Sequence, residues 1–174
     1  MSGPLIVLVG PMGVGKSTVG QLLADRLGVG YRDTDDDIVA EQGRSIADIF
    51  VDEGEPAFRA IEQRAVHTAL AEHEGVLALG GGAVLAPRTR ALLTGLPVVF
   101  LDVDVAEAIR RIGQDTARPL LAAADPRREW RTLMEARRPL YAEVARVVVD
   151  TSGLAPEDVV TAVVAALALD RARA

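Results

Sequence analysis

The chain has 174 residues, a length typical of one globular domain, and its 49% hydrophobic and 25% charged residues exclude an intrinsically disordered protein. Its formal net charge of −6 argues against a general nucleic-acid-binding surface, which is usually basic. The absence of cysteine excludes disulfides, thiolate metal sites and a cysteine nucleophile.

The first predicted element is a buried strand at residues 5–9, because a short run of branched apolar residues ends at Gly10. No basic residue precedes this run, so we expect no signal peptide and a cytoplasmic protein. The apolar stretch at residues 159–169 is too short to cross a bilayer, so we also expect no membrane partner.

Apolar periodicity and glycine or proline stops predict the other elements. In chain order they are a helix at 17–27, a strand at 30–35, helices at 38–42, 46–52 and 56–72, a strand at 76–79, a helix at 87–93, a strand at 97–102, a helix at 105–112, a mobile loop at 113–126, a helix at 127–144, a strand at 146–150 and a helix at 156–171. Ser45 is predicted to cap the helix at 46–52. This alternation is typical of a parallel sheet with helices on both faces, here in a single domain over residues 1–174.

Unusual residues follow the first three predicted strands. The strands end at Gly10, at Asp33 and Asp35, and at Gly80–Gly82. Ligands of such folds bind at the carboxyl ends of the strands, so we expect the functional site at this edge of the sheet.

The segment between the first strand and the first helix, GPMGVGKS, matches the phosphate-loop pattern G-x-x-x-x-G-K-[ST]. The glycines allow the backbone amides to turn inward around an anion, and the helix N-terminus adds partial positive charge. Lys16 can then reach the β- and γ-phosphates, and the Ser17 hydroxyl can ligate Mg²⁺. A coding bias explains why every other basic residue is arginine, but not why Lys16 remains a lysine. The alternative is a glycine turn against the sheet with a solvated lysine, and we favour nucleotide binding.

The acidic run after the second strand suits two tasks. On a strand, Asp33 and Asp35 are expected to point the same way. One carboxylate can hold Mg²⁺ through water while the other accepts the proton of a substrate hydroxyl. The alternative is a charged helix start, where acids are favoured by the helix dipole.

Arg59 and Glu62 lie three residues apart on the predicted helix at 56–72. The paired donors of Arg59 can grip a carboxylate, with Glu62 holding the guanidinium in place, although an ordinary surface ion pair has the same spacing. The glycines 80–82 indicate either close approach of backbone to a ligand or a tight strand-to-helix turn. Phe50 and Phe58 are interpreted as core residues or as walls of a pocket.

Three further arginines fit a transferring phosphate or an anionic substrate. Arg118 lies in the predicted mobile loop, and an arginine on a loop that closes over a nucleotide can stabilise the transferred phosphoryl group. Arg137 and Arg138 lie on the following helix.

Taken together, the motifs resemble the shikimate kinase family. They are GPMGVGKSTVG, DTD, SIADIF with FRAIE, LGGGAV, ARPLL and RRPLY, in the family's order, and they cover the chain from about residue 5 to about residue 150. The resemblance implies a P-loop, nucleoside-monophosphate-kinase-like three-layer α/β fold. Its five-stranded parallel sheet would have the order 2-3-1-4-5, with the phosphate loop at 10–18, a substrate-binding region at about 33–62 and a lid at about 113–124.

The resemblance also implies the reaction, in which the γ-phosphate of ATP is transferred to the 3-hydroxyl of shikimate during chorismate and aromatic amino-acid biosynthesis. The enzyme would be a monomer that uses Mg²⁺. Asp35 would bind the ring hydroxyls and orient or deprotonate the attacking one. Arg59 and Arg137 would clamp the shikimate carboxylate, with the backbone of Gly81 and Gly82 nearby.

The nucleotide site follows from the same resemblance. Lys16 and Arg118 would contact the transferred phosphate and act with Asp35 in catalysis. Ser17, and Asp33 through water, would serve Mg²⁺. Arg111 would lie near adenine. The full ATP-binding set would be Gly13, Val14, Gly15, Lys16, Ser17, Thr18, Arg111 and Arg118.

Two points depart from the family pattern or rest on alignment alone. Thr151-Ser152-Gly153 follows the last strand where many relatives have a basic residue, so a backbone contact to adenine is the alternative there. Arg137 is preferred over Arg138 by aligning the Pro-Leu-Tyr that follows. Other interpretations are a kinase for gluconate or a nucleoside monophosphate, and a phosphate-loop binding module without turnover.

Overall fold

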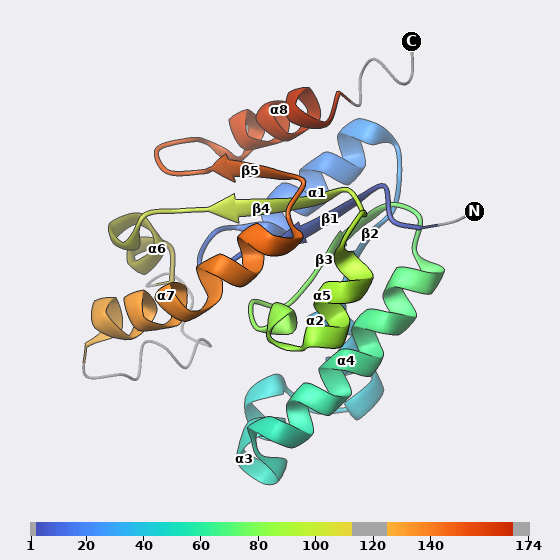
Figure 1. Cartoon of the computed structure of the whole chain (residues 1–174), viewed down its shortest axis with the longest axis vertical. Coiled ribbons are helices and arrows are strands. Elements are labelled where there is room, and N and C mark those ends of the chain that lie inside the picture. Colours follow the sequence, from blue (N-terminus) through green and yellow to red (C-terminus); the bar gives the residue numbers. More distant parts are fainter. Residues whose placement is uncertain (1–2, 113–124, 169–174) are drawn as a thin grey trace.

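The computed structural model describes residues 3–112 and 125–168 and has a five-stranded parallel sheet at its centre (Figure 1). The strand order is β2-β3-β1-β4-β5, which confirms the predicted fold class and sheet order. The strands are β1 (Ile6–Val9), β2 (Tyr31–Asp33), β3 (Val76–Ala78), β4 (Val98–Asp102) and β5 (Val147–Asp150). All neighbouring strands pair in parallel.

The strands are buried according to their place in the sheet. Strands β1 and β3 are buried along their whole length, because both edges of each are paired and helices cover both faces. Strand β2 lies at one edge and is half-buried, and β5 lies at the other. Continuous runs such as IVLV therefore occupy the centre, where apolar side chains are covered on both faces.

Helices cover both faces of the sheet (Figure 1). On one face α1 (Lys16–Leu27) packs against α8 (Pro156–Leu167). On the other, α5 (Pro87–Leu93) contacts both α4 (Glu55–Glu72) and α7 (Pro126–Val144). The main hydrophobic core lies between these layers. Within the described ranges, no helix is both long and apolar enough to span a membrane.

A second, smaller core lies away from the sheet, where α2 (Thr34–Gln42) and α3 (Ile46–Glu53) pack on α4 (Figure 1). The buried residues of this small core are Ile38, Ile49, Phe58, Ile61 and Ala65. The Ser45 hydroxyl accepts the Asp48 amide at 3.1 Å, which confirms the predicted cap of α3.

The acidic run after β2 corrects one prediction. We expected a strand to continue through Asp35, with both aspartates on one face. Instead Asp33 is the last strand residue and the N-cap of α2, and its carboxylate accepts the Asp35 amide at 2.8 Å. Asp35 therefore lies in the first turn of a helix, because a capping aspartate and three acids in the first turn favour helix initiation over strand.

Other boundaries also differ from prediction. The loop expected to run to residue 126 ends earlier, because Asp125 caps α7 and Pro126 occupies its first turn. The last helix ends at Leu167 and not at Arg171, with Ala168 in a left-handed conformation at φ 55°. A short 3₁₀ helix, η1 (Ala83–Leu85), was not predicted. Helix α6 (Val105–Ile112) has the predicted bounds. The proposed lid at 113–124 lies outside the described residues.

Candidate functional site

The phosphate loop joins β1 to α1 at the carboxyl edge of the sheet, as predicted. Gly13 shows why the loop needs glycine. Its φ of 86° lies in the left-handed region, and an added Cβ would lie 2.9 Å from the Ala108 carbonyl oxygen on α6. The Trp130 indole on α7 donates to the Met12 carbonyl at 3.1 Å. Helices α6 and α7 therefore both press against the loop.

Lys16, the first residue of α1, is turned back onto this loop. Its ammonium donates to the carbonyl oxygens of Gly10 at 2.7 Å and Pro11 at 3.0 Å. The next residues, Ser17 and Thr18, are exposed in the first turn of the helix. The predicted cation and hydroxyl therefore lie together at the helix N-terminus, where anions are favoured.

Asp33 faces this helix terminus from the end of β2. Its carboxylate accepts the Tyr31 hydroxyl at 3.2 Å as well as the Asp35 amide. Burial raises the pKa of Asp33, whereas the Asp35 amide and the charge of Lys16 lower it. No cluster of three or more His, Asp or Glu side chains that could cage a metal occurs among the residues described. The two predicted donors, the Ser17 hydroxyl and the Asp33 carboxylate, therefore do not belong to a protein cage among the described residues.

Two carboxylates converge on Gly80, two residues after the end of β3. A Cβ at this position would lie 2.7 Å from Oδ1 of Asp35 and 3.0 Å from Oε2 of Glu62. Asp35 reaches this point from α2, and Glu62 reaches it from α4. Glycine is therefore required at residue 80 by close packing of acidic side chains against the backbone.

Arg59 lies on α4 one turn before Glu62 and donates to its Oε1 at 2.8 Å. Its guanidinium also stacks near Phe58, at 5.2 Å from the ring centroid, and near Phe50, at 6.0 Å. A Cβ on Gly82 would clash with this guanidinium. The alternative that Arg59 and Glu62 form an ordinary surface ion pair is excluded, because Glu62 is only 3% exposed. Both phenylalanines therefore support the arginine as well as the small core.

The neighbouring arginines of α7 point to different surroundings. Nη1 of Arg137 would lie 3.6 Å from a Cβ on Gly81, and its charge lowers the pKa of Glu62. Arg138 instead forms an ion pair with Asp102 at the end of β4 and is exposed. Arg137 is thus the one that shares a site with Arg59 and Glu62.

Glu62 is paired with Arg59 and also senses the charge of Arg137. Burial raises its pKa, and both arginines act in the opposite direction. The effect of burial is the larger, so the ionised carboxylate is disfavoured even with two cations nearby. The backbone of the three glycines 80–82, called the glycine triplet below, lies next to all these side chains.

Tyr141 belongs to the site but was not predicted. Its hydroxyl donates to the Gly81 carbonyl oxygen at 2.5 Å, and its ring packs on Phe100 with centroids 5.0 Å apart. Burial raises the pKa of Tyr141 to about 12. The signal that could have found it is its spacing, four residues after Arg137 on one helix, which places both side chains on the same face.

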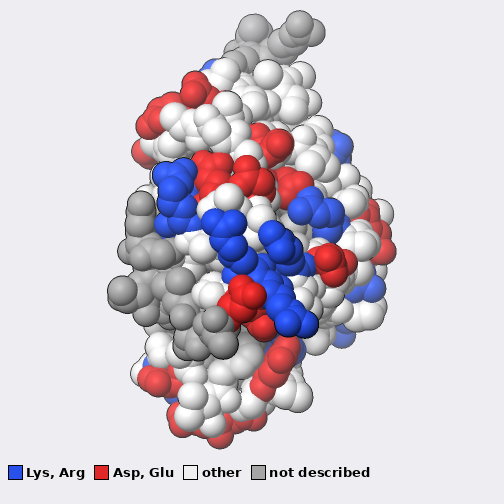
Figure 2. Space-filling view, turned by 90° about the vertical axis from the view of Figure 1, so that its left-hand side faces the viewer, with Lys and Arg blue, Asp and Glu red and all other residues white. Residues whose placement is uncertain are grey.

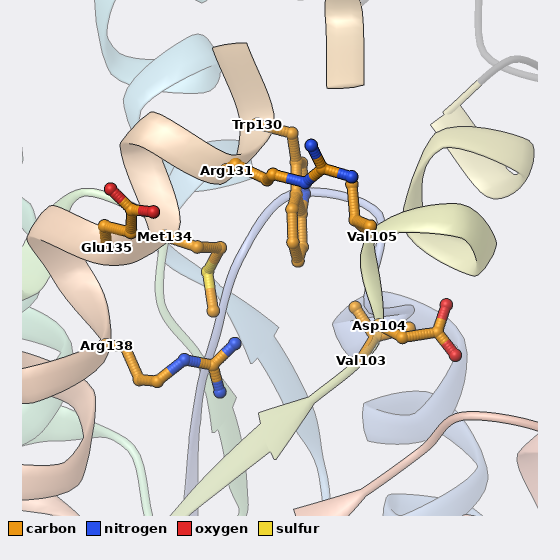
Figure 3. A pocket seen from close by; sticks show the side chains of 8 residues that line it. All are labelled: Val103, Asp104, Val105, Trp130, Arg131, Met134, Glu135 and Arg138. Atoms are coloured by element: carbon orange, nitrogen blue, oxygen red, sulfur yellow. The ribbon is translucent and has the colours of Figure 1, made fainter. Parts of the chain in front are cut away.

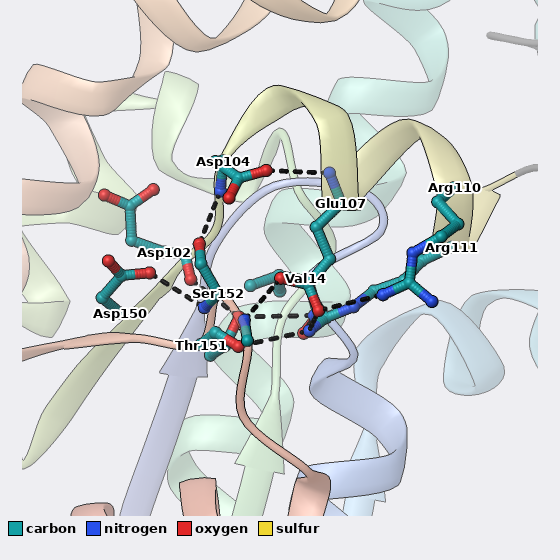
Figure 4. A network of polar contacts seen from close by, with 10 residues as sticks. Val14, Asp102, Asp104, Glu107, Arg110, Arg111, Asp150, Thr151 and Ser152 are labelled. Carbon is teal, nitrogen blue, oxygen red and sulfur yellow. Dashed lines mark hydrogen bonds and ion pairs between the residues drawn. The ribbon is translucent and has the colours of Figure 1, made fainter.

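Arg111 joins three segments of the chain beside the phosphate loop (Figure 4). Its guanidinium donates to the Val14 carbonyl at 2.9 Å, to the Thr151 carbonyl at 3.2 Å and to Glu107 at 2.7 Å. Glu107 also accepts the Gly153 amide at 2.7 Å, and this amide and Arg111 lower its pKa. The turn after β5 is thus tied to α6 and the phosphate loop without a basic side chain of its own.

A hollow of about 240 Å³ opens on the other side of α7 (Figure 3). It is lined by Val103, Asp104, Val105, Trp130, Arg131, Met134, Glu135 and Arg138. Trp130 and Met134 also line a smaller cavity with Arg137 and Tyr141, so these two side chains separate the hollow from the arginine site.

Charges of both signs surround the site. Figure 2 shows Lys and Arg side chains gathered in the middle of one face, with Asp and Glu side chains between them. Such an arrangement can neutralise a small anionic ligand without creating a broad basic surface. The predicted residues Lys16, Asp33, Asp35, Arg59 and Arg137 meet at one edge of the sheet, whereas Arg118 lies outside the described residues.

Comparison with known proteins gives consistent matches. The family model for shikimate kinase matches residues 12–168. The shikimate kinase of Streptomyces avermitilis is 69% identical over 172 residues, covering 99% of this chain and 100% of that protein. The shikimate kinase of Streptomyces coelicolor is 67% identical with the same coverage. The structure of Acinetobacter baumannii shikimate kinase in complex with shikimate is 36% identical, covers 98% of this chain and 95% of that one, and superimposes with a TM-score of 0.91.

Proposed function

The chain belongs to the shikimate kinase family, and from this premise we propose how its residues transfer the γ-phosphoryl group of ATP to the 3-hydroxyl of shikimate. The observation that supports the assignment is the meeting of Asp35, Glu62, Arg59 and Arg137 around the glycine triplet, beside the phosphate loop. The two arginines suit the carboxylate of a small substrate, and the carboxylate of Asp35 suits its hydroxyl groups.

The substrate end of the site binds through Arg59 and Arg137, called the carboxylate clamp below. Arg59 is held by Glu62 and by two aromatic rings, so its planar donors keep one orientation before the substrate arrives. Gly81 and Gly82 leave room beside both guanidinium groups, because neither has a Cβ. The carboxylate fixes one end of the ring, and the hydroxyls then face Asp35.

At the reacting end, the substrate hydroxyl oxygen forms a bond to the γ-phosphorus while the bond from that phosphorus to the β–γ bridging oxygen breaks. Asp35 orients the hydroxyl and accepts its proton, and ADP leaves with the bridging oxygen. Lys16 exchanges its backbone acceptors on Gly10 and Pro11 for phosphate oxygens. Arg118 acts on the same phosphate. Val14, Thr18 and Arg111 complete the nucleotide site with the remaining residues of the phosphate loop.

The residues present fit Mg²⁺. This ion usually binds through one or two protein oxygens, waters and substrate phosphates instead of a protein cage, which agrees with a lone hydroxyl on Ser17 and a nearby carboxylate on Asp33. When bound, Mg²⁺ neutralises charge on the phosphate oxygens. Ser17 would hold it directly and Asp33 through water. We further propose a cytoplasmic monomer that binds neither nucleic acid nor membranes.

The substrate is tested by measuring ADP release from MgATP with shikimate, gluconate or AMP as acceptor. We expect shikimate alone to raise the rate well above that with MgATP only. Stimulation by gluconate or AMP and not by shikimate would assign another kinase of the same fold, and no stimulation by any of them would indicate a binding module.

The Asp35→Asn variant tests the proposed role of Asp35 in the same assay. It keeps the shape of the side chain but cannot take up a proton, so ATP affinity is retained and turnover is lost. A variant with unchanged turnover would contradict the role of Asp35.

A further inference from the structure

The middle carbonyl of the glycine triplet has a different kind of partner from the other two. The Gly80 oxygen accepts the Ala83 amide at 3.1 Å, and the Gly82 oxygen accepts the Leu85 amide at 3.1 Å. Both bonds belong to the turn that becomes η1. The Gly81 oxygen instead accepts the Tyr141 hydroxyl, which comes from α7 on the far side of the site. The middle peptide of the triplet is therefore oriented by a side chain.

Three glycines in succession need such a restraint. Without side chains they have more accessible backbone conformations than any other residues, and ordering them costs more conformational entropy. Gly80 faces Asp35 and Glu62, and Gly82 faces Arg59. A rotation of the Gly81 peptide would therefore disturb the backbone that packs against both the acidic and the arginine side chains of the site.

Arg137 lies one helical turn earlier on α7, and its guanidinium lowers the pKa of the same hydroxyl. The Tyr141 oxygen is therefore near a cation while its proton goes to the Gly81 carbonyl oxygen. Tyr141 is 0% exposed, and burial raises its pKa to about 12, so the hydroxyl keeps this proton at neutral pH.

We propose that Tyr141 is a positioning residue for shikimate: its hydroxyl fixes the Gly81 peptide beside the Arg137 guanidinium, on the carboxylate side of the site. This role rests on the proposed function of Arg137. It assigns no chemistry to Tyr141 itself, because the hydroxyl is buried and its proton is donated to the Gly81 carbonyl oxygen. The consequence is a selective effect on recognition of the substrate carboxylate.

The direct test is the Tyr141→Phe variant, which keeps the ring against Phe100 and removes only the hydroxyl. We expect KM for shikimate to rise by about tenfold, because one buried hydrogen bond is lost, while KM for ATP changes less than about twofold. The matched control is Glu143→Gln on the same helix, which weakens an exposed ion pair with Arg90 and leaves KM for shikimate within about twofold of wild type. Equal changes in both KM values of Tyr141→Phe, or no change in either, would refute the proposal.

A second measurement does not depend on how much of the variant folds. The ratio of kcat/KM for shikimate to kcat/KM for shikimate methyl ester cancels the concentration of active enzyme. If Tyr141 positions the carboxylate clamp, this ratio falls by about tenfold in Tyr141→Phe, whereas a merely structural role leaves it unchanged. Wild-type enzyme that releases no ADP with shikimate would instead overturn the proposed function.

Discussion

Glu62 shows that the site is assembled at a cost in stability. A carboxylate that is 3% exposed loses most of its hydration, and its raised pKa means that Arg59 and Arg137 do not fully replace it. The ionised form is nevertheless the one that can hold Arg59 by a charge-assisted hydrogen bond. We infer that this position favours binding of an anionic substrate over stability of the fold.

The pH dependence of stability follows from that raised pKa. A carboxyl group with a higher pKa in the folded than in the unfolded state binds more protons when folded, so its contribution to the free energy of unfolding is present at low pH and is lost as the pH rises through the folded pKa. We expect Glu62→Gln, which does not titrate, to gain Tm relative to wild type as the pH is raised from 4 to 8.

The matched control for this experiment is Glu107→Gln, because Glu107 is also a glutamate in an arginine ion pair but has a lowered pKa. Its difference from wild type must change in the opposite direction, with wild type gaining stability as the pH rises through the range where glutamate titrates. A constant Tm difference between Glu62→Gln and wild type across this range would show that burial of Glu62 has no net effect on its proton affinity.

At the scale of elements, the geometry of α7 directs two adjacent arginines into different surroundings. Adjacent residues on a helix point about 100° apart, so Arg137 faces the glycine triplet while Arg138 pairs with Asp102 beside the hollow. From the sequence alone, Arg137 could be preferred over Arg138 only by aligning the Pro-Leu-Tyr that follows. Their different surroundings in the fold now give a physical reason to prefer Arg137.

Alanine variants of the two arginines test this division. Arg137→Ala is expected to raise KM for shikimate by roughly 30-fold or more, the equivalent of at least about 2 kcal/mol for a lost buried contact to a carboxylate. Arg138→Ala loses a half-exposed ion pair and is expected to change KM for shikimate less than about threefold. Steady-state kinetics with saturating MgATP measures both. The reverse order of effects would assign the clamp to Arg138.

Elements also show what sequence patterns can and cannot predict. Helix α5 and helix α6 were predicted with their exact residues, because proline or apolar spacing marks both ends. The strand-to-helix change at Asp33 was missed, since the same acids fit strand alternation or a first helical turn. Tyr141 was missed because a tyrosine in a helix gives no sign of the carbonyl it will meet across the fold.

At the scale of the whole molecule, the strand order was expected from family resemblance and not from the chain's own periodicity. Alternating strands and helices indicate a parallel sheet but leave the order of strands open. That order places β3 between β2 and β1, which brings the glycine triplet between Asp33 and the phosphate loop. Long-range placement of this kind depends on tertiary packing, which no local pattern records.

The two hydrophobic cores divide the site between them. Asp35 and Arg59 lie on helices of the small core, whereas Arg137 and the phosphate loop rest on the main core. Helix α3 depends on the small core alone, with Ile49 the one buried residue among its eight and Val51 85% exposed. Few buried apolar contacts mean a low free energy of local opening, so α3 is expected to open more readily than β1.

Hydrogen–deuterium exchange measures this coupling. In the free enzyme the amides of α3 should exchange faster than those of β1. Saturating shikimate should slow exchange in α2 to α4, because a ligand held by Asp35, Arg59 and Arg137 joins the small core to the main one and must be released before either opens. MgADP, whose proposed contacts reach the small-core side only at Asp33 before α2, should protect the phosphate loop and leave α3 unchanged. In Arg59→Ala the shikimate effect on α3 should disappear. Equal protection of α3 by MgADP and shikimate would instead mean that the two cores open as one unit.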